Sequence, residues 1–494
     1  MSSCPVAQRA RLQRESKETA RIIIVGSGPA GIAAATRLLE HGFRHVRILE
    51  AEDRIGGRIN TIPYGDNVID LGAQWCHGEV GNVVYERVKD LDMVTKTGDF
   101  MNTFRFLRSN RELVPQPTAN ALRTAAENSI PDGPNAYDGS MGDYLTHKYW
   151  QEVAKMPDVD RAIASEMFES FKRGECGTEG SDTLFELSGR SHLEFVECKG
   201  DLLIHWRNKG YASFLRLLMH AKEDVPGDLG VLSGKVQLSK RVSQINWEGD
   251  NDLVLRCWNG ELMAADHVIC TMSLGVLKEQ HCSLFLPSLP EAKVRAIRGL
   301  KLGTVDKLFL EFAVQPLPQN WSGVHFLWME QDLKELRDSK HFWLESVFAI
   351  HRFEDQPRML EGWIIGEHAR YMETLQKDEV LEGLMWMLRK FLPFDLPQPK
   401  SFLRTQWHSN PHFRGSYSFR STYTDELQTG PWDLAAPLTN ACGKPRLQFA
   451  GEASSRTHYS TVHGATETGW READRLNEYY ARGSGAVSRM QPAN

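Results

Sequence analysis

Long apolar runs are absent from this sequence. Nowhere do about eighteen apolar residues follow one another, as a membrane-spanning helix requires. Residues 1–20 are polar and of mixed charge, without the apolar region of a signal peptide, and the final MQPAN is not an S-K-L-type peroxisomal address. We therefore expect a cytoplasmic protein that binds no membrane, with flexible segments at residues 1–20 and 482–494.

Metal-binding patterns and an excess of basic residues are missing too. The eight cysteines are scattered, with no C-x-x-C pair and no histidine cluster of the kind that binds zinc, so we expect no metal site and a reducing compartment. The formal net charge of −6 gives no basic surface for nucleic acid. The rest of the composition, 41% hydrophobic and 25% charged over 494 residues, is that of a globular protein with more than one domain.

What the sequence does contain begins with a strand, a glycine turn and a helix. Residues 22–25 are β-branched and predict a buried parallel strand. Gly26, Gly28 and Gly31 have the G-x-G-x-x-G spacing, in which the first glycine makes a tight turn, the second lets a pyrophosphate approach and the third lets the helix pack on the strand. A helix at residues 32–40 would direct its first N–H groups at the phosphate. The pattern predicts a dinucleotide site, although glycine turns also occur in proteins that bind nothing.

A second predicted strand, residues 45–50, ends in a carboxylate. Glu50 lies nineteen residues beyond Gly31, where an acidic residue accepts hydrogen bonds from the adenosine ribose. The alternative is a solvated glutamate at a strand end. A pair of glycines then stands between two arginines, and their flexibility would let Arg58 bind the same pyrophosphate.

Several motifs together resemble those of the FAD-dependent amine oxidases. They are GSGPAG at residues 26–31, LEAEDRIGGR at 49–58 and DLGAQWCHG at 70–78. A further motif, LQFAGEASSRTHYSTVHG at 447–464, resembles the carboxy-terminal FAD signature of the polyamine oxidases in that family. The resemblance extends over about residues 20–480 and implies an α/β fold, with a Rossmann-like FAD-binding domain and a discontinuous α+β substrate-binding domain.

The resemblance and the change of sequence rhythm place the domain boundaries. The FAD-binding domain would comprise residues 21–94, 232–300 and 441–481. The substrate-binding domain would comprise residues 95–231 and 301–440, where the alternation of strand, glycine and helix is lost.

The resemblance also implies which residues contact FAD. The backbone of residues 72–75 would run along the isoalloxazine ring, and the backbone of Val242 would meet the adenine. Glu452 would hydrogen-bond the ribityl or pyrophosphate part, and the N–H groups of Thr461 and Val462 would meet the pyrimidine end. Any of these residues could instead serve turn geometry only. The expected cofactor-binding residues are Gly26, Ser27, Gly28, Ala30, Gly31, Glu50, Ala51, Gly57, Arg58, Gly72, Ala73, Gln74, Trp75, Val242, Glu452, Thr461 and Val462.

Two residues are expected at the reacting atoms. Alternation over residues 303–312 predicts a strand with Lys307 on the same face as Val305 and Phe309. By resemblance, Lys307 matches the lysine that holds a water against flavin N5; the alternative is a lysine that extends to solvent. His77 matches a polyamine-oxidase histidine beside the substrate, where an imidazole can bind an amine and tune its protonation.

The remaining catalytic candidates are also matched by resemblance. Tyr417 and the pair Ser460 and Thr461 occupy family positions that face the flavin and the substrate, although the tyrosine could equally be a core aromatic residue. Monoamine oxidases of the same superfamily attach their flavin through a cysteine in the turn where this chain has Gly-Ser-Tyr at residues 415–417. We therefore expect non-covalent FAD.

The activity implied is oxidation of a polyamine at a secondary amine. A hydride would move to flavin N5, water would hydrolyse the imine, and dioxygen would become hydrogen peroxide. Asp306 lies in a strand that resembles the spermine-oxidase version and could pair with a substrate ammonium, whereas residues 468–476 resemble the acetylpolyamine-oxidase version. We expect spermine or N1-acetylspermine as the substrate, with contacts from His77, Asp306, Glu194, Glu197, Tyr417 and Ser460.

Some alternatives stay open. Glu194 and Glu197 could supply a carboxylate for a distal ammonium, but surface glutamates are the commoner case. An amino-acid oxidase of the same superfamily would need an arginine for the substrate carboxylate, and none is assigned. A non-catalytic FAD-binding protein is a third interpretation. We expect a monomer whose partners are the polyamine and dioxygen.

Overall fold

The computed structural model describes residues 16–96, 103–131, 137–191, 194–222, 225–248, 252–353 and 355–488, with residues 483–488 described by their backbone alone. This part of the chain forms two compact units. The first takes the residues up to Asn60, Tyr211–Ile297 and those from Thr429 onward. The second takes Thr61–Gly210 and Arg298–Gln428. No helix within the described ranges has both the length and the apolar character needed to cross a bilayer.

The first unit is built on a mostly parallel sheet in the order β22-β23-β13-β1-β2-β9. Its strands are β1 (Arg21–Val25), β2 (His45–Leu49), β9 (Val236–Gln237), β13 (His267–Cys270), β22 (Leu438–Thr439) and β23 (Pro445–Phe449). The β-branched β1 lies between β13 and β2 and is parallel to both, so it is buried as the sequence predicts. The sheet is therefore that of a doubly wound nucleotide-binding domain.

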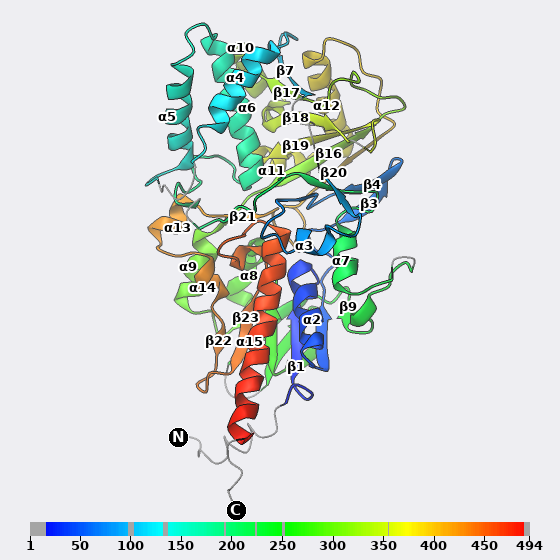
Figure 1. Cartoon of the computed structure of the whole chain (residues 1–494), viewed down its shortest axis with the longest axis vertical. Helices are drawn as coiled ribbons and strands as arrows, with labels where there is room; N and C mark the ends of the chain where they lie inside the picture. Colours follow the sequence, from blue (N-terminus) through cyan, green and yellow to red (C-terminus); the bar gives the residue numbers. More distant parts are fainter. Residues whose placement is uncertain are drawn as a thin grey trace, which may run out of the picture. The chain divides into compact units, whose positions relative to one another are not determined.

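Two helices from opposite ends of the chain lie side by side in this unit. Figure 1 shows the C-terminal helix α15 (Val462–Ser488) beside α2 (Pro29–Glu40). A Cβ at Gly469 of α15 would collide with the Ala30 carbonyl of α2, so glycine permits this close approach. The carboxy-terminal motif is thereby held at the glycine turn.

The rest of the first unit consists of a second sheet and shorter helices. The second sheet has the order β12-β11-β10-β14. Its strands are β10 (Val242–Asn246), β11 (Leu253–Cys257), β12 (Leu262–Ala265) and β14 (Phe285–Leu286). The helices are α7 (Ala212–Leu218), α8 (Leu274–Leu284), most of α9 (Glu291–Gly299) and α14 (Pro431–Ala435).

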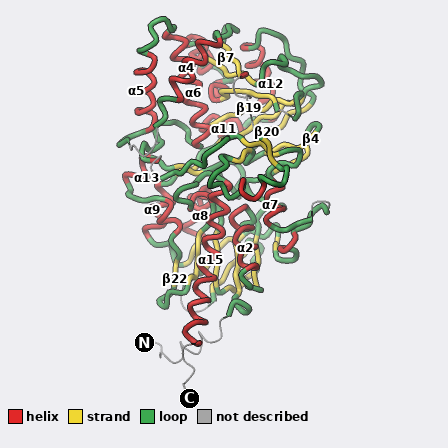
Figure 2. Tube along the Cα trace, in the orientation of Figure 1, coloured by secondary structure: helices red, strands yellow, loops and turns green. Residues whose placement is uncertain are grey.

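The second unit is built on a mixed sheet in the order β20-β16-β19-β18-β17-β7, drawn in yellow in Figure 2. Its neighbouring strands are antiparallel except for β17 and β7. The strands are β7 (Phe104–Arg108), β16 (Val305–Glu311), β17 (Gly323–Leu327), β18 (Val347–Arg352), β19 (Met359–Ile365) and β20 (Ser401–Arg404). Every residue of β16 is buried, so this strand is the rigid centre of the unit.

Helices and short strands complete the second unit. The helices are α3 (Tyr85–Val88), α4 (Gln116–Glu127), α5 (Met141–Val153), α6 (Arg161–Glu179), α10 (Glu330–Arg337), α11 (Gly366–Thr374), α12 (Lys377–Phe391) and α13 (Thr422–Glu426). The short strands are β3 (Thr61–Tyr64), β4 (Asn67–Asp70), β5 (Trp75–Cys76), β6 (Val94–Thr95), β8 (Ile204–Trp206), β15 (Lys301–Leu302) and β21 (Ser418–Phe419).

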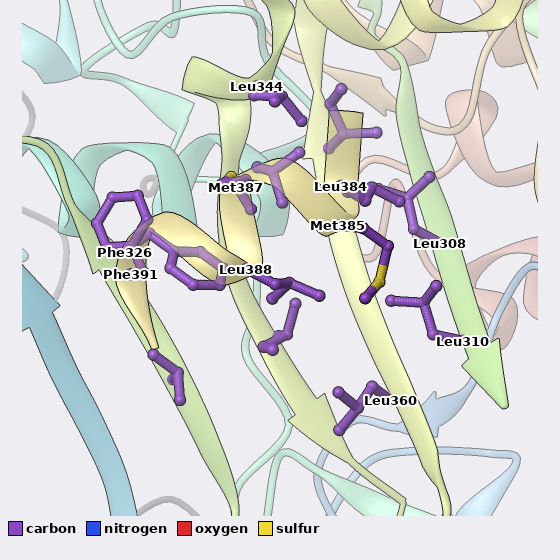
Figure 3. Close-up of a cluster of buried hydrophobic side chains, with 14 of the residues drawn as sticks. Leu308, Leu310, Phe326, Leu344, Leu360, Leu384, Met385, Met387, Leu388 and Phe391 are labelled. Carbon is purple, nitrogen blue, oxygen red and sulfur yellow. The ribbon is translucent and has the colours of Figure 1, made fainter. Parts of the chain in front are cut away.

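The main core of the second unit lies between the sheet and α12. Figure 3 shows Leu308 and Leu310 of β16 pointing toward Leu384 and Met385 of α12, all within one cluster of buried side chains. Because side chains alternate across a strand, packing these leucines under α12 turns Lys307 and Phe309 to the other face of the sheet. The core thus fixes the direction of Lys307.

The domain boundaries expected from the sequence differ from those of the two units. Residues 61–94 belong to the second unit, because Ile69 of the β3–β4 hairpin packs on Phe309 and Met359. Residues 211–231 and 429–440 belong to the first unit. These segments make their contacts through tertiary packing that the local pattern does not encode.

The expected flexible ends are described only in part. Residues 1–15 and 489–494 lie outside the described residues. Residues 16–19 form a turn, in which the amide of Thr19 donates to the Ser16 carbonyl at 3.1 Å. Helix α15 continues to Ser488, and the expected flexibility from residue 482 stays a prediction.

Candidate functional site

The glycine turn after β1 has the tight geometry that a dinucleotide site needs. Gly26 has a φ of +105°, and a Cβ there would collide with the Thr271 hydroxyl. A Cβ at Gly31 would collide with the Gly26 carbonyl, so the third glycine lets α2 begin directly against the turn. Both glycines are therefore required by close contacts, as the spacing predicts.

The N-terminus of α2 has no side-chain cap. Gly28 is its N-cap residue, Pro29 follows at the first position, and no side chain accepts a hydrogen bond from the first turn. A Cβ at Gly28 would meet only the Gly56 carbonyl, at 4.0 Å. The amides at this end, including those of Ala30 and Gly31, therefore face an open position suited to an anion.

Glu50 lies at the same turn and is buried. Its Oε2 accepts hydrogen bonds from the amide and the hydroxyl of Ser27, both at 2.7 Å, and its Oε1 accepts from the Glu52 amide at 2.9 Å. Glu50 therefore stabilises the turn itself. Its Oε1 still has capacity for a ribose hydroxyl, since a carboxylate oxygen can accept more than one hydrogen bond.

The segment after Glu50 folds back onto the glycine turn. The Gly56 amide donates to the Ser27 carbonyl at 2.9 Å. A Cβ at Gly57 would lie 3.2 Å from Gly28 Cα, and Gly57 has a φ of +59°. Residues 51–58, which include Ala51, therefore lie against the phosphate end of the turn.

Arg58 joins the amino-terminal motifs to the carboxy-terminal one. Its Nη1 donates to Glu452 Oε1 at 2.9 Å, and the Ser460 amide donates to Glu452 Oε2 at 2.9 Å. Arg58 and Glu452 line one cavity. Ser460 has a φ of +66°, a backbone conformation that non-glycine residues rarely adopt outside functional turns.

Thr461 is the residue immediately before α15. Its hydroxyl accepts from the Gly464 amide at 3.0 Å and donates to the His458 carbonyl at 2.7 Å. The chain thus uses this hydroxyl as a helix cap, which leaves the first amides of the helix, including that of Val462, as the groups offered to a ligand.

Val242 follows a segment that pairs with the chain after β2. The Lys240 amide donates to the Glu50 carbonyl at 2.7 Å, and the Glu50 amide donates to the Gln237 carbonyl at 2.9 Å. Val242 therefore lies two residues beyond Lys240, whose amide is bonded to Glu50 at the end of β2. Together, an uncapped helix start, a carboxylate, a guanidinium and an open glycine turn form a donor set that fits FAD.

Lys307 in the second unit is held by the third motif. Its ammonium donates to the Asp70 carbonyl at 2.9 Å and to Gln74 Oε1, and it forms an ion pair with Glu361 Oε1 at 3.3 Å. Its side chain is only 5% exposed, so the alternative of a lysine extending to solvent is wrong. Because β16 turns Lys307 to this face of the sheet, its ammonium reaches the segment that contains Gly72, Ala73, Gln74 and Trp75.

Aromatic rings enclose this ammonium. The rings of Trp75 and Trp363 stack with centroids 5.3 Å apart, and Lys307 Nζ lies 5.2 Å from the Trp363 ring. Such faces attract a cation and exclude water. Trp363 is paired directly with Lys307 across the strands, so the register between β16 and β19 creates this arrangement.

The sequence did not point to Glu361 or His351, although both are in the site. Glu361 is fully buried, and its Oε2 lies 2.8 Å from His351 Nε2 and 3.1 Å from Gln74 Nε2. Burial alone would raise the pKa of Glu361, but Lys307 and His351 outweigh it and lower the pKa to about 2. A lone acid in the apolar strand MLEGWII was the available signal.

Asp306 does not face the lysine site. It lies on the opposite face of β16, where its Oδ1 accepts from the Thr405 hydroxyl at 2.8 Å and from the Trp407 amide at 3.2 Å. Burial and then the neighbouring Glu373 raise the pKa of Asp306 well above its usual range. The expectation that Asp306 pairs with a substrate ammonium is wrong, because adjacent residues of a strand point to opposite faces.

The His77 side chain is exposed at the surface, but desolvation by the protein around its ring lowers its pKa, which favours the neutral imidazole. Its Nδ1 lies 2.7 Å from the Leu202 carbonyl, which can only accept, so Nδ1 carries the hydrogen. In the neutral imidazole, Nε2 then has the lone pair and can accept a proton from an amine.

Tyr417 lies at the end of α6, near Glu179. Its hydroxyl donates to the Gly177 carbonyl. Burial raises the pKa of Glu179 to about 7 and that of Glu175 to about 8, to which repulsion by Glu179 and Glu127 contributes. Burial and Glu179 also raise the pKa of Tyr417. These carboxyl groups were missed in the sequence because acids on a helix are common on surfaces.

The two glutamates expected to bind the substrate are elsewhere. Glu194 forms an ion pair with Arg420 at 2.5 Å, and Arg420 also pairs with Asp425 at 2.7 Å. Glu197 is exposed. A carboxylate already neutralised by arginine is a poor partner for an ammonium, so Glu194 does not fulfil the expectation.

Ser416 occupies the turn that bears the flavin-linking cysteine in monoamine oxidases. Its hydroxyl accepts from the Val305 amide at 2.8 Å and donates to the Val305 carbonyl at 2.9 Å. The side chain therefore ties this turn to the first residue of β16.

Comparison with known proteins agrees with this geometry. The sequence matches the family described as flavin containing amine oxidoreductase over residues 29–477. The chain belongs to that family. It is therefore an oxidoreductase enzyme with FAD as its cofactor, and the residues of the first unit that fit FAD are those named above.

Relatives within the amine oxidoreductase family match along nearly the whole chain. Peroxisomal N(1)-acetyl-spermine/spermidine oxidase of Homo sapiens is 31% identical, over 93% of this chain and 95% of that protein. Probable polyamine oxidase 5 of Arabidopsis thaliana is 28% identical, over 93% of this chain and 98% of that protein. A redesigned putrescine oxidase of known structure has a TM-score of 0.65 at 17% identity, over 92% of this chain and 98% of that chain, which confirms the fold alone.

Proposed function

We propose that this enzyme oxidises polyamines at a secondary amine, with spermine or N1-acetylspermine as its substrate. The observation that carries the proposal is the contact of the Lys307 ammonium with Asp70 and Gln74, beside the stacked rings of Trp75 and Trp363. Relatives whose names specify acetylated spermine, spermidine and polyamine support the substrate class. When bound, FAD accepts a hydride from the carbon next to the nitrogen and passes the electrons to dioxygen, giving hydrogen peroxide.

The residues of this chain prepare the amine for that transfer. A protonated amine is a poor hydride source, so its proton must leave first. His77 Nε2 is the exposed lone pair available to take it, with Nδ1 fixed by the Leu202 carbonyl. The stacked rings of Trp75 and Trp363 exclude water from the neighbourhood of Lys307.

Glu175 and Glu179 are the proposed partners for a distal ammonium of the substrate. Their pKa values are raised by burial, and a cation placed beside them would lower those values and be stabilised in return. We propose Glu175 and Glu179 for this contact instead of Asp306 and Glu194, which were expected from the sequence. They favour a substrate with more than one amine over a simple monoamine.

The proposal is tested by a substrate panel read through peroxide release. We expect kcat/KM for spermine and N1-acetylspermine to exceed that for spermidine, and all three to exceed that for benzylamine. A preference for benzylamine would remove the polyamine assignment. The ratio of kcat/KM for spermine to kcat/KM for N1-acetylspermine shows whether the free or the acetylated polyamine is the preferred substrate.

Three accompanying proposals concern the state of the enzyme. We infer that FAD is held non-covalently, so acid precipitation should release all flavin into the supernatant. We also infer a monomer in the cytoplasm, a reducing compartment that suits the buried thiols of Cys76, Cys176, Cys257 and Cys270. Size-exclusion chromatography and cell fractionation test these points, and flavin left on the denatured chain would contradict the first.

A further inference from the structure

We propose that Glu361 is a positioning residue that keeps Lys307 a fixed ammonium, with His351 and Gln74 holding the carboxylate in place. This inference rests on the proposed function only in that Lys307 is taken to act at the reacting atoms. Its consequence is that Lys307 does not take the proton of the substrate amine.

The burial of Lys307 and Glu361 carries a cost in free energy. The Lys307 side chain is 5% exposed and that of Glu361 is fully buried, and their charged atoms lie 3.3 Å apart. An ammonium taken out of water is strongly destabilising unless a charge of opposite sign accompanies it. The other two acceptors of Lys307, the Asp70 carbonyl and Gln74 Oε1, are neutral, so Glu361 supplies that charge.

Lys307, Gln74 and Glu361 form a closed ring of contacts. Lys307 donates to Gln74 Oε1, Gln74 Nε2 donates to Glu361 Oε2 at 3.1 Å, and Glu361 Oε1 faces Lys307. The oxygen of the Gln74 amide thus accepts a hydrogen bond and its nitrogen donates one, which fixes the orientation of the amide. Gln74 belongs to the motif at residues 70–78, so its hydrogen bond to Glu361 helps to fix the position of that segment.

His351 holds the Glu361 carboxylate from the neighbouring strand. His351 of β18 is paired across the strands with Glu361, and its Nε2 lies 2.8 Å from Glu361 Oε2. In β16, Lys307 lies diagonally opposite Glu361 on the same face. Three adjacent strands therefore set the positions of the ion pair before any ligand binds.

Other titratable groups surround the ring. His205, from β8, hydrogen-bonds the Trp75 indole at 3.2 Å, and burial and then His351 lower its pKa. His325, from β17, stacks on Phe106, and burial and then His351 lower its pKa to about 4. The further charged groups that face this cluster are Asp201, Asp355, Arg123 and, behind β16, Asp306 and Glu373.

A fixed ammonium has a defined chemical role. Lys307 can donate hydrogen bonds and supply positive charge, but it has no lone pair for an incoming proton. The base for the substrate amine must then be another group, and His77 Nε2 is exposed for that purpose.

The test compares FAD-loaded Glu361→Gln and Glu361→Asp with wild type by anaerobic flavin reduction from pH 6 to pH 10. We expect Glu361→Gln to reduce flavin at least tenfold more slowly and to gain an ionisation that wild type lacks, because Lys307 loses its counter-ion. Glu361→Asp should recover most of the rate without that ionisation. Glu166→Gln is the matched control, since it breaks a buried pair with Arg108 at 2.7 Å in the same unit. A wild-type pH profile in Glu361→Gln would overturn the proposal.

A second measurement needs no substrate and so separates this inference from the proposed function. Lys307→Met leaves Glu361 without its ammonium, and Glu361→Gln leaves Lys307 without its carboxylate. The double variant removes both charges, so its Tm should exceed that of Lys307→Met. Additive losses of stability in the double variant would show that the two residues are not coupled, whichever amine the enzyme oxidises.

Discussion

Arg58 is the residue through which the proposed FAD contact of the first unit can be tested. It contacts Glu452, which in turn fixes the Ser460 amide. Arg58→Ala should weaken FAD binding by about 1.5–3 kcal/mol, the value of a charge-assisted hydrogen bond. Titration of the apoprotein with FAD measures this, with Arg44→Ala as the control because Arg44 pairs with Glu18 on the surface. Equal FAD affinity in wild type and Arg58→Ala would place the pyrophosphate elsewhere.

Glu179 is the residue through which the proposed recognition of a distal ammonium can be tested. Glu179→Gln should lower kcat/KM for spermine about tenfold, or about 1.4 kcal/mol, and leave benzylamine unchanged because it has no distal charge. Glu169→Gln is the control on the same helix, since Glu169 pairs with Lys172. If spermine and benzylamine lose activity equally, Glu179 supports the fold and does not bind the substrate.

At this scale the sequence predicted some residues and missed others for a physical reason. The close contacts of Gly26 and Gly31 were predictable because they follow from local spacing along one strand, turn and helix, whereas the ribose contact expected of Glu50 stays a prediction. Glu361 and His351 were not, because they meet Lys307 only through the pairing of β16, β18 and β19. Strand register is a long-range property that no short motif contains.

Among the elements, β16 has the largest effect on the site. Its Asp306 shows how a correct strand prediction can still give a wrong residue, since the alternation placed Lys307 properly but Asp306 was assigned from a resemblance. The structure uses Asp306 to link β16 to the Thr405 hydroxyl, whose oxygen also accepts from the Lys307 amide at 2.8 Å. The strand is thereby tied to β20 at the lysine.

The carboxyl group of Asp306 gives β16 a pH-dependent stability. Its folded pKa is raised above the unfolded value, so its contribution is fully present below the unfolded pKa and is lost as pH rises through the folded pKa. Asparagine mimics the protonated form, so the Tm of Asp306→Asn relative to wild type should rise with pH. Thermal unfolding from pH 5 to pH 9 measures this trend.

Asp332→Asn provides the control of opposite sign. Burial would raise the pKa of Asp332, but Ser109 and Lys390 outweigh it and lower the pKa, so its contribution to stability is lost only in acid. This variant should be less stable than wild type at neutral pH and approach it in acid. A difference between Asp306→Asn and wild type that does not change with pH would contradict the raised pKa of Asp306.

For the whole molecule, the sequence predicted the two-part architecture and its class but not every boundary. Family motifs mark the glycine turn and the start of α15, and both lie in the first unit as expected. The β3–β4 hairpin was assigned wrongly because its apolar residues complete the core beside Phe309, more than two hundred residues away in sequence. Packing between distant segments decides such boundaries.

We propose above all that FAD in this enzyme accepts electrons from a polyamine. Anaerobic mixing of the purified FAD-bound protein with spermine, N1-acetylspermine or benzylamine in a stopped-flow spectrometer tests it most directly. The account predicts rapid loss of the oxidised flavin absorbance with one or both polyamines, at a rate that saturates with concentration, and little change with benzylamine. Flavin that stays oxidised in the presence of every polyamine would contradict it.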